Sequence, residues 1–514
     1  MRGQFGHQLF RRLSDSRPNG RGHRAGYADQ NQVRKMRIFL QEKLMMTSFT
    51  KWLYAVVAIT YFCGGAAQAA TQAAANCTSS AIQSAINSAS NGDIVSVPAC
   101  SSGSWSSGVS IPSTKGITLQ GAGAGRTVIS TGYSLSIDTL PTNAPVRVTG
   151  FTFIRTNTTT RIFVLGTAQN WRIDNNVFDD AGINGAYTIE VGVKGNENLD
   201  SYNYGVIDHN QFINRNYATS IHVSWVRRTF DAVASGDWVW SQPGQRGTAQ
   251  AVYVEDNIFS GTQTASQVVD TQYGAKVVVR YNTIHNPWIS THSGCTNGGR
   301  NSPWTEVYRN KFTDDVNQYG GSPIEMRSTS GVIWGNMSAT RLNNYVISID
   351  HERSYRTDCS GPYGGRADGT RSYDGNTGLH GYRALGQPGW GPPQVTNMSN
   401  PSFAGIFAWG NLNGGSLTNL VIVNNNGFTS EHLQSGREFF NESNMTSGTI
   451  ANRPSTCSVG PPRSVYVSTN ENSQGATIYV CIATNVWTKH WEPFIYPHPL
   501  IENRLMPPYL HDPK

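Results

Sequence analysis

Short runs of alternating apolar and polar residues recur along the middle of the chain, and each ends in a turn that contains Asn. The period-two alternation, with Val, Ile, Tyr and Phe at the apolar positions, predicts β-strands. From Asn257 onward the Asn recurs at intervals of 25, 28 and 26 residues, which is a repeat length typical of solenoids. The runs are WRIDNNVF (171–178), GVIDHNQF (205–212), AVYVEDNIF (251–259), KVVVRYNTI (276–284), TEVYRNKF (305–312) and GVIWGNMS (331–338). The pattern therefore predicts a parallel β-helix.

Two columns of side chains should stack inside this solenoid. Asn tolerates a left-handed backbone, so we expect each repeated Asn to bend the chain from one sheet into the next and to bond to the Asn of the next coil. One coil cannot bury its apolar face alone, so the apolar residue two places after each Asn should stack inward. The first column comprises Asn176, Asn210, Asn257, Asn282, Asn310 and Asn336, and the second comprises Phe178, Phe212, Phe259, Ile284 and Phe312.

The start of the chain reads as a leader. An apolar run at 52–65 follows Lys51 and ends in Ala67-Gln68-Ala69, which is typical of a secretory signal peptide. The run is too short for a comfortable membrane span. We therefore predict a leader at 1–69 and a secreted mature chain, extracellular or periplasmic, that has no transmembrane anchor.

Removing this leader changes the charge and the cysteine count. The whole chain has 40 basic and 33 acidic residues, but residues 1–69 hold 11 and 3 of them, which leaves 29 and 30. The basic character thus belongs to the leader, and a nucleic-acid partner is not expected. Six cysteines remain, and an even number in a secreted chain predicts disulfides. We expect sequential pairs: Cys77–Cys100, Cys295–Cys359 and Cys457–Cys481.

The ends of the solenoid should be capped. Ile82, Ala85 and Ile86 fall on one face of a predicted helix, which the Asn91-Gly92 turn connects to a first strand at 93–97. At the other end, a hairpin with a turn at 470–475 predicts a small module that caps the solenoid or serves as a docking tag. The predicted organisation is leader 1–69, N-terminal cap 70–110, β-helix 111–453 and C-terminal module 454–514, in a monomer.

Two N-terminal segments resemble the pectate-lyase-like superfamily. They are CTSSAIQSAINSASNGDIVSVPAC (77–100) and GSWSSGVSIPSTKGITLQGAGAGRTVIS (103–130), in which a helix, a GD-x-V-x-VP strand and an I-x-LQG-x-G-x-x-x-T-x-I stretch follow in the superfamily's order. With the Asn repeats, the resemblance covers roughly 77–428. It implies an all-β, right-handed parallel β-helix and a carbohydrate-active protein. The superfamily includes lyases, hydrolases, epimerases and non-catalytic adhesins, so the resemblance implies no single activity.

A second set of strands carries the candidate chemistry. They are YTIEV (187–191), SIHVS (220–224), QVVDTQY (267–273), PIEMRS (323–328) and VISIDHER (346–353). Successive strands of a β-helix stack about 4.8 Å apart, so matching positions form a ladder on one outer face. The predicted ladder contains Glu190, His222, Asp270 and Glu325, with Gln272 and Arg327 two positions further along and His292 between the coils of Asp270 and Glu325.

This ladder suits the cleavage of a uronate-containing polysaccharide by β-elimination. The reaction needs a cation beside the substrate carboxylate, a base for the α-proton and an acid for the leaving oxygen. Ca²⁺ held by Asp270 and Glu325 would supply the cation. Arg327 is the first candidate for base or carboxylate clamp, and the resembled families employ an Arg base; His292 is a rival for base or acid. The expected substrate-binding residues are Glu190, His222, Gln272, Trp238 and Trp240, the last two from an insertion at 226–247.

Other interpretations of the same residues stay open. Asp270 and Glu325 also suit the two carboxylates of a glycoside hydrolase. A polar ladder on a solenoid can equally be a solvated surface of a glycan-binding protein that is not an enzyme. The VIDHN stretch (206–210) is similar to the W-I-D-H stretch of pectate lyases, but it occupies the ordinary repeat turn, and we prefer a structural role for it. The R-x-P-x-x-R-x-G signature of pectate lyases is absent.

Overall fold

The computed structural model describes the chain from residue 69 to residue 502 with gaps. The described ranges are 69–138, 145–192, 203–215, 219–224, 246–261, 267–292, 302–313, 322–339, 342, 347–350, 388–389, 403–422 and 433–502, apart from 167, 184, 186, 273, 303, 328 and 419. Within these residues, no helix combines the length and the apolar character that a membrane crossing would need. Residues 1–68 of the predicted leader, Trp238, Trp240 and the Cys295–Cys359 pair lie outside them.

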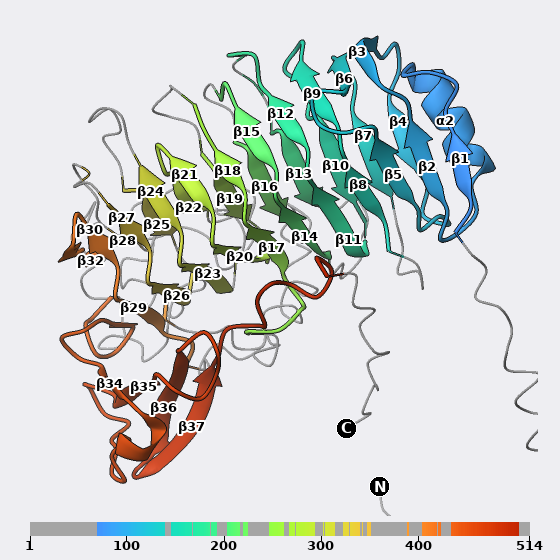
Figure 1. Ribbon diagram of the computed structural model, residues 1–514. Coiled ribbons are helices and arrows are strands. Elements are labelled where there is room, and N and C mark those ends of the chain that lie inside the picture. Colours follow the sequence, from blue (N-terminus) through green and yellow to red (C-terminus); the bar gives the residue numbers. More distant parts are fainter. Residues whose placement is uncertain are drawn as a thin grey trace, which may run out of the picture. The chain divides into compact units, whose positions relative to one another are not determined.

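Three stacks of strands form the β-helix (Figure 1), and each coil from β2–β4 onward contributes one strand to each stack, while β1 and β33 extend sheet A alone and β31 adds an antiparallel strand to sheet B. Sheet A contains β1 (Thr71–Ala73), β2 (Ile94–Val97), β5 (Thr118–Gly121), β8 (Arg147–Thr149), β11 (Gln169–Asp174), β14 (Tyr204–Asp208), β17 (Val252–Glu255), β20 (Lys276–Arg280), β23 (Trp304–Tyr308), β26 (Gly331–Trp334), β29 (Ile406–Trp409) and β33 (Phe439–Phe440). Sheet B contains β3 (Cys100–Ser104), β6 (Thr127–Thr131), β9 (Thr152–Arg155), β12 (Val177–Asp179), β15 (Gln211–Ile213), β18 (Ile258–Phe259), β21 (Thr283–His285), β24 (Lys311–Thr313), β27 (Met337–Ser338), β30 (Leu412–Asn413) and β31 (Ser416–Leu417). Sheet C contains β4 (Val109–Ile111), β7 (Leu135–Asp138), β10 (Ile162–Leu165), β13 (Ile189–Gly192), β16 (Ile221–Ser224), β19 (Val269–Gln272), β22 (Ile289–Thr291), β25 (Ile324–Arg327), β28 (Ile347–Asp350) and β32 (Leu420–Ile422). The predicted parallel β-helix is confirmed.

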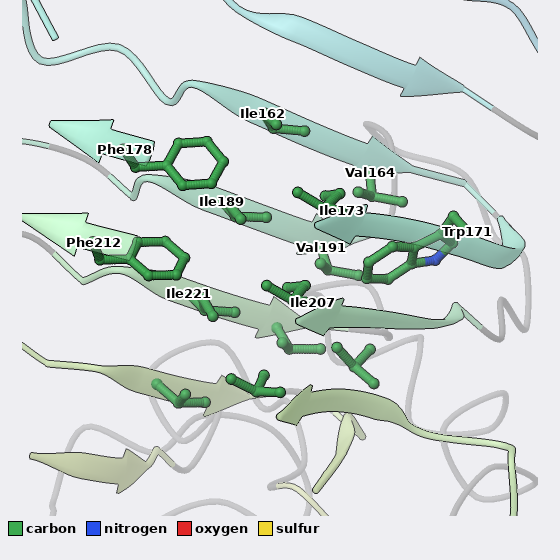
Figure 2. Packing of buried hydrophobic residues seen from close by; sticks show 14 of the residues in the cluster. Ile162, Val164, Trp171, Ile173, Phe178, Ile189, Val191, Ile207, Phe212 and Ile221 are labelled. Carbon is green, nitrogen blue, oxygen red and sulfur yellow. The ribbon is translucent and has the colours of Figure 1, made fainter. Parts of the chain in front are cut away.

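The core runs along the inside of these sheets. Figure 2 shows Phe178 and Phe212 side by side, with Ile162, Ile189 and Ile221 pointing inward from successive strands of sheet C. The ring centroids of Phe178 and Phe212 lie 5.1 Å apart, and those of Phe212 and Phe259 lie 4.6 Å apart. The predicted column of aromatic residues is therefore confirmed, and it buries apolar surface that one coil could not cover by itself.

The asparagine column is a continuous ladder of hydrogen bonds. The Nδ2 of Asn257 donates to the Oδ1 of Asn282 over 3.0 Å, and the Nδ2 of Asn282 donates to the Oδ1 of Asn310 over 3.0 Å. The same bond joins each successive pair from Asn176 to Asn336, and from Asn336 the ladder continues to Asn411. The sequence pattern missed Asn411 because 75 residues separate it from Asn336.

The left-handed backbone that turns each coil lies one residue earlier than predicted. The residue before the ladder Asn has φ between 52° and 61° in each of these coils: Asn175, His209, Asp256, Tyr281, Arg309, Gly335 and Gly410. The expectation that the ladder Asn itself adopts this conformation is wrong. Its side chain must point inward to bond along the ladder, so the preceding residue makes the bend.

A helix and a disulfide cover the N-terminal end. Helix α2 (Ser79–Ser88) buries Ile82, Ala85 and Ile86, as predicted, and contacts β1, β2 and β4 (Figure 1). Thr78 caps the helix by accepting a hydrogen bond from the Ala81 amide. The Cys77–Cys100 disulfide joins this helix to the first coil.

A four-stranded sheet forms the C-terminal module. It contains β34 (Thr446–Gly448), β35 (Val465–Ser468), β36 (Thr477–Ala483) and β37 (Val486–Trp491), with a 3₁₀ turn, η5 (Ile450–Asn452), after β34. β35 and β36 form the predicted antiparallel hairpin, and the predicted Cys457–Cys481 disulfide is present. The sheet begins at Thr446, ahead of the predicted boundary at 454.

The segment after β37 lies along the outer face of sheet A. Two buried arginines hold it: Arg280 donates to the carbonyls of Phe494 and Ile495 over 2.7 and 2.9 Å, and Arg172 donates to the carbonyl of Ile501 over 3.1 Å. Arg280 also donates to Glu255. The C-terminal segment thus covers part of the outer face of sheet A. The predicted row of Glu190, His222, Asp270 and Glu325 lies on sheet C instead.

Candidate active site on the outer face of sheet C

One row of side chains crosses the outer face of sheet C in register. Its members, from the N-terminal end, are Ser110, Ser136, Phe163, Glu190, His222, Asp270, Ser290, Glu325 and Ser348. The predicted alignment of Glu190, His222, Asp270 and Glu325 is therefore what the strand register gives. Ser290 is a rung that the sequence pattern missed, because β22 is only three residues long.

A second row lies two residues further along the same strands. Gln272 pairs with Ser224 on one side, and Arg327 pairs with Asp350 on the other. His292 follows β22, and its amide donates to the Thr271 carbonyl over 2.8 Å. This places His292 between the coils of Asp270 and Arg327, as predicted.

Four of these side chains form a chain of hydrogen bonds. The Nδ1 of His292 lies 2.6 Å from Asp270 Oδ1, and Arg327 Nη1 lies 2.8 Å from His292 Nε2. Arg327 Nη2 donates to Glu325 Oε2 over 2.8 Å. Because a guanidinium only donates, Nε2 of His292 accepts, and Nδ1 carries the proton that bonds to Asp270. The imidazole is therefore neutral in this arrangement, and Asp270 orients it.

The four side chains differ in their exposure. The side chains of His292 and Arg327 are 26% and 24% exposed, whereas that of Asp270 is 5% exposed. The carboxylate of Asp270 therefore lies behind the two partly exposed nitrogen groups of His292 and Arg327. We name these residues, Asp270, His292, Glu325 and Arg327, the sheet C tetrad.

Two further residues fix Glu325 and were not predicted from the sequence. The indole Nε1 of Trp288 and the hydroxyl of Ser290 both donate to Glu325 Oε2, over 3.1 and 3.2 Å. Together with Arg327, they direct three donors at one carboxylate oxygen. Glu325 therefore acts as an acceptor that positions the guanidinium of Arg327. The signal that could have found them is the Trp-Ile-Ser-Thr stretch (288–291) between Asn282 and Asn310.

Glu190 and His222 extend the row toward the N-terminal coils. The ring of His222 is fully buried and stacks on Tyr187 with 4.1 Å between ring centroids. Its Nδ1 lies 3.9 Å from Glu190 Oε1, and Glu190 is partly exposed. His222 is thus placed to support Glu190 rather than to touch a ligand directly. Gln272 lies against Asp270, with its Nε2 3.5 Å from Asp270 Oδ2.

Asp270 and Glu325, the predicted Ca²⁺ ligands, lie on strands of sheet C that are not adjacent. Both residues pair with Ser290, so their strands are two rungs apart, or about 10 Å. Glu325 already accepts from Arg327, whose positive charge opposes a cation there. Among the described residues, no group of three or more His, Cys, Asp or Glu side chains is arranged around a common metal position.

The VIDHN stretch has a structural role in sheet A. Asp208 accepts two hydrogen bonds from Arg172, over 2.9 and 2.7 Å, and is buried. His209 occupies the left-handed turn position, and its hydrogen bond to Asp208 raises the pKa of the His209 imidazole. The interpretation of this stretch as an ordinary repeat turn is confirmed.

Comparisons with known proteins add little to this geometry. No protein-family model and no curated protein matches the chain. A solved structure that matches is the catalytic domain of GH87 alpha-1,3-glucanase in complex with nigerose, at 10% sequence identity and a TM-score of 0.24, over 70% of this chain and 68% of that chain. At this similarity the match identifies neither substrate nor reaction.

Proposed function

We propose that the protein is a secreted polysaccharide lyase that cleaves a uronate-containing glycan by β-elimination at the sheet C tetrad. The observation that supports this proposal is the hydrogen-bonded order Asp270–His292–Arg327–Glu325. It places an oriented neutral imidazole next to a fixed guanidinium on an open sheet face. The Cys77–Cys100 and Cys457–Cys481 disulfides agree with an oxidising compartment outside the cytoplasm.

The tetrad divides the reaction between a base and a clamp. The carboxylate of a bound uronate takes the guanidinium of Arg327 as its partner, which releases His292 Nε2 and makes the α-proton of the sugar more acidic. Nε2 removes the proton from C5, the electron pair forms the C4–C5 double bond, and the C4–O bond breaks. The imidazolium then returns the proton to the leaving oxygen. Asp270 stabilises the imidazolium between these steps.

His292 is a better base than Arg327 in this arrangement. Arg327 donates to both His292 and Glu325, and a guanidinium beside a carboxylate holds its proton. Histidine is the side chain best suited to exchange a proton near neutral pH, and His292 already has its second nitrogen bound to a carboxylate. The geometry therefore supports His292 as base and Arg327 as carboxylate clamp.

An inverting glycoside hydrolase is the second candidate. Asp270 and Glu325 stand two rungs apart, about 10 Å between strands, which is near the upper end of the separation that inverting enzymes use. Such an enzyme needs one of the two as a proton donor. Glu325 accepts from three donors at one oxygen, and this arrangement favours the lyase.

The test uses mature protein from Ala70 with pectate, alginate, chondroitin and xanthan. Absorbance of unsaturated uronates reports elimination, and reducing ends without that absorbance report hydrolysis. We expect His292→Gln to lower kcat about 100-fold or more, the usual effect of losing a general base. Arg327→Lys should keep more activity than Arg327→Ala, because it retains a positive charge. Ser348→Ala, in the same row outside the tetrad, is the control.

Each outcome decides between candidates. Unsaturated product that His292→Gln abolishes supports the lyase. Hydrolysis lost in Asp270→Asn and Glu325→Gln supports the hydrolase, and silence on every substrate leaves a glycan-binding protein. Ca²⁺ is tested in the same assay: a rate that a chelator abolishes and Ca²⁺ restores would support the ion, and a chelator-insensitive rate would remove it from the mechanism.

A further inference from the structure

The first row on sheet C, which contains Asp270 and Glu325 of the tetrad, leads into a pocket at its N-terminal end. The pocket has a volume of about 730 Å³ and is lined by residues of β4, β7 and β10 and of the turns beside them, among them Ser110, Ser136 and Phe163. These three belong to the row itself, and Phe163 pairs directly with Glu190. The pocket and the tetrad therefore share one continuous face of sheet C.

The lining of this pocket is uncharged and combines polar groups with apolar ones. Among the described residues that line it are hydroxyl groups, the amide of Asn157 and the rings of Tyr133 and Phe163, and none of them is Asp, Glu, Lys, Arg or His. Tyr133 is 46% exposed, so its ring is accessible to a molecule in the pocket. Hydroxyls and an amide beside aromatic faces are groups that bind a neutral sugar ring, because its edge is polar and its faces are apolar.

The wall of the pocket is fixed from behind by a buried charge. Arg161 is buried, and it donates to the Asn157 side chain over 3.1 Å and to the carbonyls of Thr131, Asn157 and Thr159. Burial lowers the pKa of Arg161 to about 10, so it stays protonated at neutral pH. Asn157 in turn donates to the Gly132 carbonyl over 3.0 Å. The turn is thus preorganised, which lowers the cost of ordering it around a ligand.

We infer that this pocket is a binding site for neutral sugars of the same glycan that reaches the tetrad, and the inference rests on the proposed function. From β10 to β22 is four strand spacings, about 19 Å. A glycan lying across the strands therefore spans several sugars between Phe163 and His292. The tetrad takes a uronate through Arg327, whereas the uncharged pocket selects unionised sugars. The expected substrate is a heteropolysaccharide that contains both uronates and neutral sugars.

The test measures binding and catalysis separately. Titration calorimetry with gluco-, galacto-, manno- and xylo-oligosaccharides and with oligouronates gives Kd for the wild type, Phe163→Ala and Tyr133→Ala. We expect one neutral series to bind and its Kd to rise about tenfold in each variant, the loss of one aromatic contact. Trp487→Ala, an aromatic change in the C-terminal module, should leave this Kd unchanged, and thermal melting confirms that each variant folds.

The catalytic readout keeps this inference distinct from the lyase proposal. On the polymer, Phe163→Ala should raise KM several-fold with little change in kcat, and on oligouronates too short to reach the pocket it should change neither. Neutral binding that depends on Phe163 supports the pocket even if no lyase activity exists. The inference is overturned if no neutral series binds, if oligouronates bind there instead, or if Phe163→Ala binds like the wild type.

Discussion

The asparagine ladder gives a stability prediction that the structure makes quantitative. Asn282 is fully buried, and its Oδ1 accepts from the backbone amide and the side-chain amide of Asn257, over 2.9 and 3.0 Å. Its Nδ2 donates to the carbonyls of Val254 and Arg280 and to Asn310. In Asn282→Ala the backbone amide of Asn257 and the carbonyl of Val254 lose these partners at a buried position. At about 1–3 kcal/mol for each stranded group, the free energy of unfolding should fall by about 3 kcal/mol.

The isosteric variant Asn282→Asp distinguishes the loss of hydrogen bonds from the loss of side-chain volume as the cause of any destabilisation. The carboxylate keeps an acceptor for the Asn257 amide, but it places a second oxygen against three acceptors and buries a charge. We expect this isosteric variant to be less stable than Asn282→Ala. Asn87→Ala, on the exposed face of α2, is the matched control and should change stability by less than about 0.5 kcal/mol.

Urea unfolding followed by tryptophan fluorescence, with equal slopes among the variants, gives these differences. Hydrogen exchange at the Asn257 amide provides a local readout, since this amide loses its acceptor only in Asn282→Ala. If Asn282→Ala were as stable as Asn87→Ala, or if Asn282→Asp were the more stable of the two, the ladder would not stabilise the coils as argued.

Three further predictions concern the C-terminal module and its contact with sheet A. Arg280→Met should destabilise the protein by about 3–5 kcal/mol, because the buried Glu255 loses its ion-pair partner. Limited proteolysis should then cut at 494–501, which Arg280 holds, and unchanged protection would contradict the role given to Arg280. Burial lowers the pKa of His498 to about 3, whereas the imidazole of the unfolded chain has a pKa near 6.5. The folded state is therefore not penalised above about pH 6.5, and the free energy of unfolding falls by up to about 1.4 kcal/mol per pH unit as the pH drops from there toward 3. His498→Gln should flatten that part of the curve of unfolding free energy against pH, and an unaltered curve would refute this assignment. Removing the disulfide in the Cys457→Ala, Cys481→Ala double variant should cost about 3 kcal/mol, judged from the sequence separation of 24, and calorimetric melting measures the loss.

Much of the fold was predictable because it depends on short-range pattern. Alternation shows which side chains point inward, and the Asn spacing marks the coils, so the core column and the ladder could be deduced without coordinates. Matching positions on successive strands even aligned Glu190 with Glu325. The pattern failed where it was short or interrupted: β22 is too brief to stand out, and a long insertion hides Asn411.

The sequence by itself determined that the chain forms a parallel β-helix and that one outer face carries carboxylates, imidazoles and a guanidinium. Only the tertiary structure decided how those groups connect, because a hydrogen bond depends on positions within a few tenths of an ångström and not on spacing along the chain. It joined His292 to both Asp270 and Arg327, and Trp288 to Glu325. It also placed the C-terminal segment on sheet A, over 200 residues from Arg280, since such contacts leave no periodic trace in the sequence.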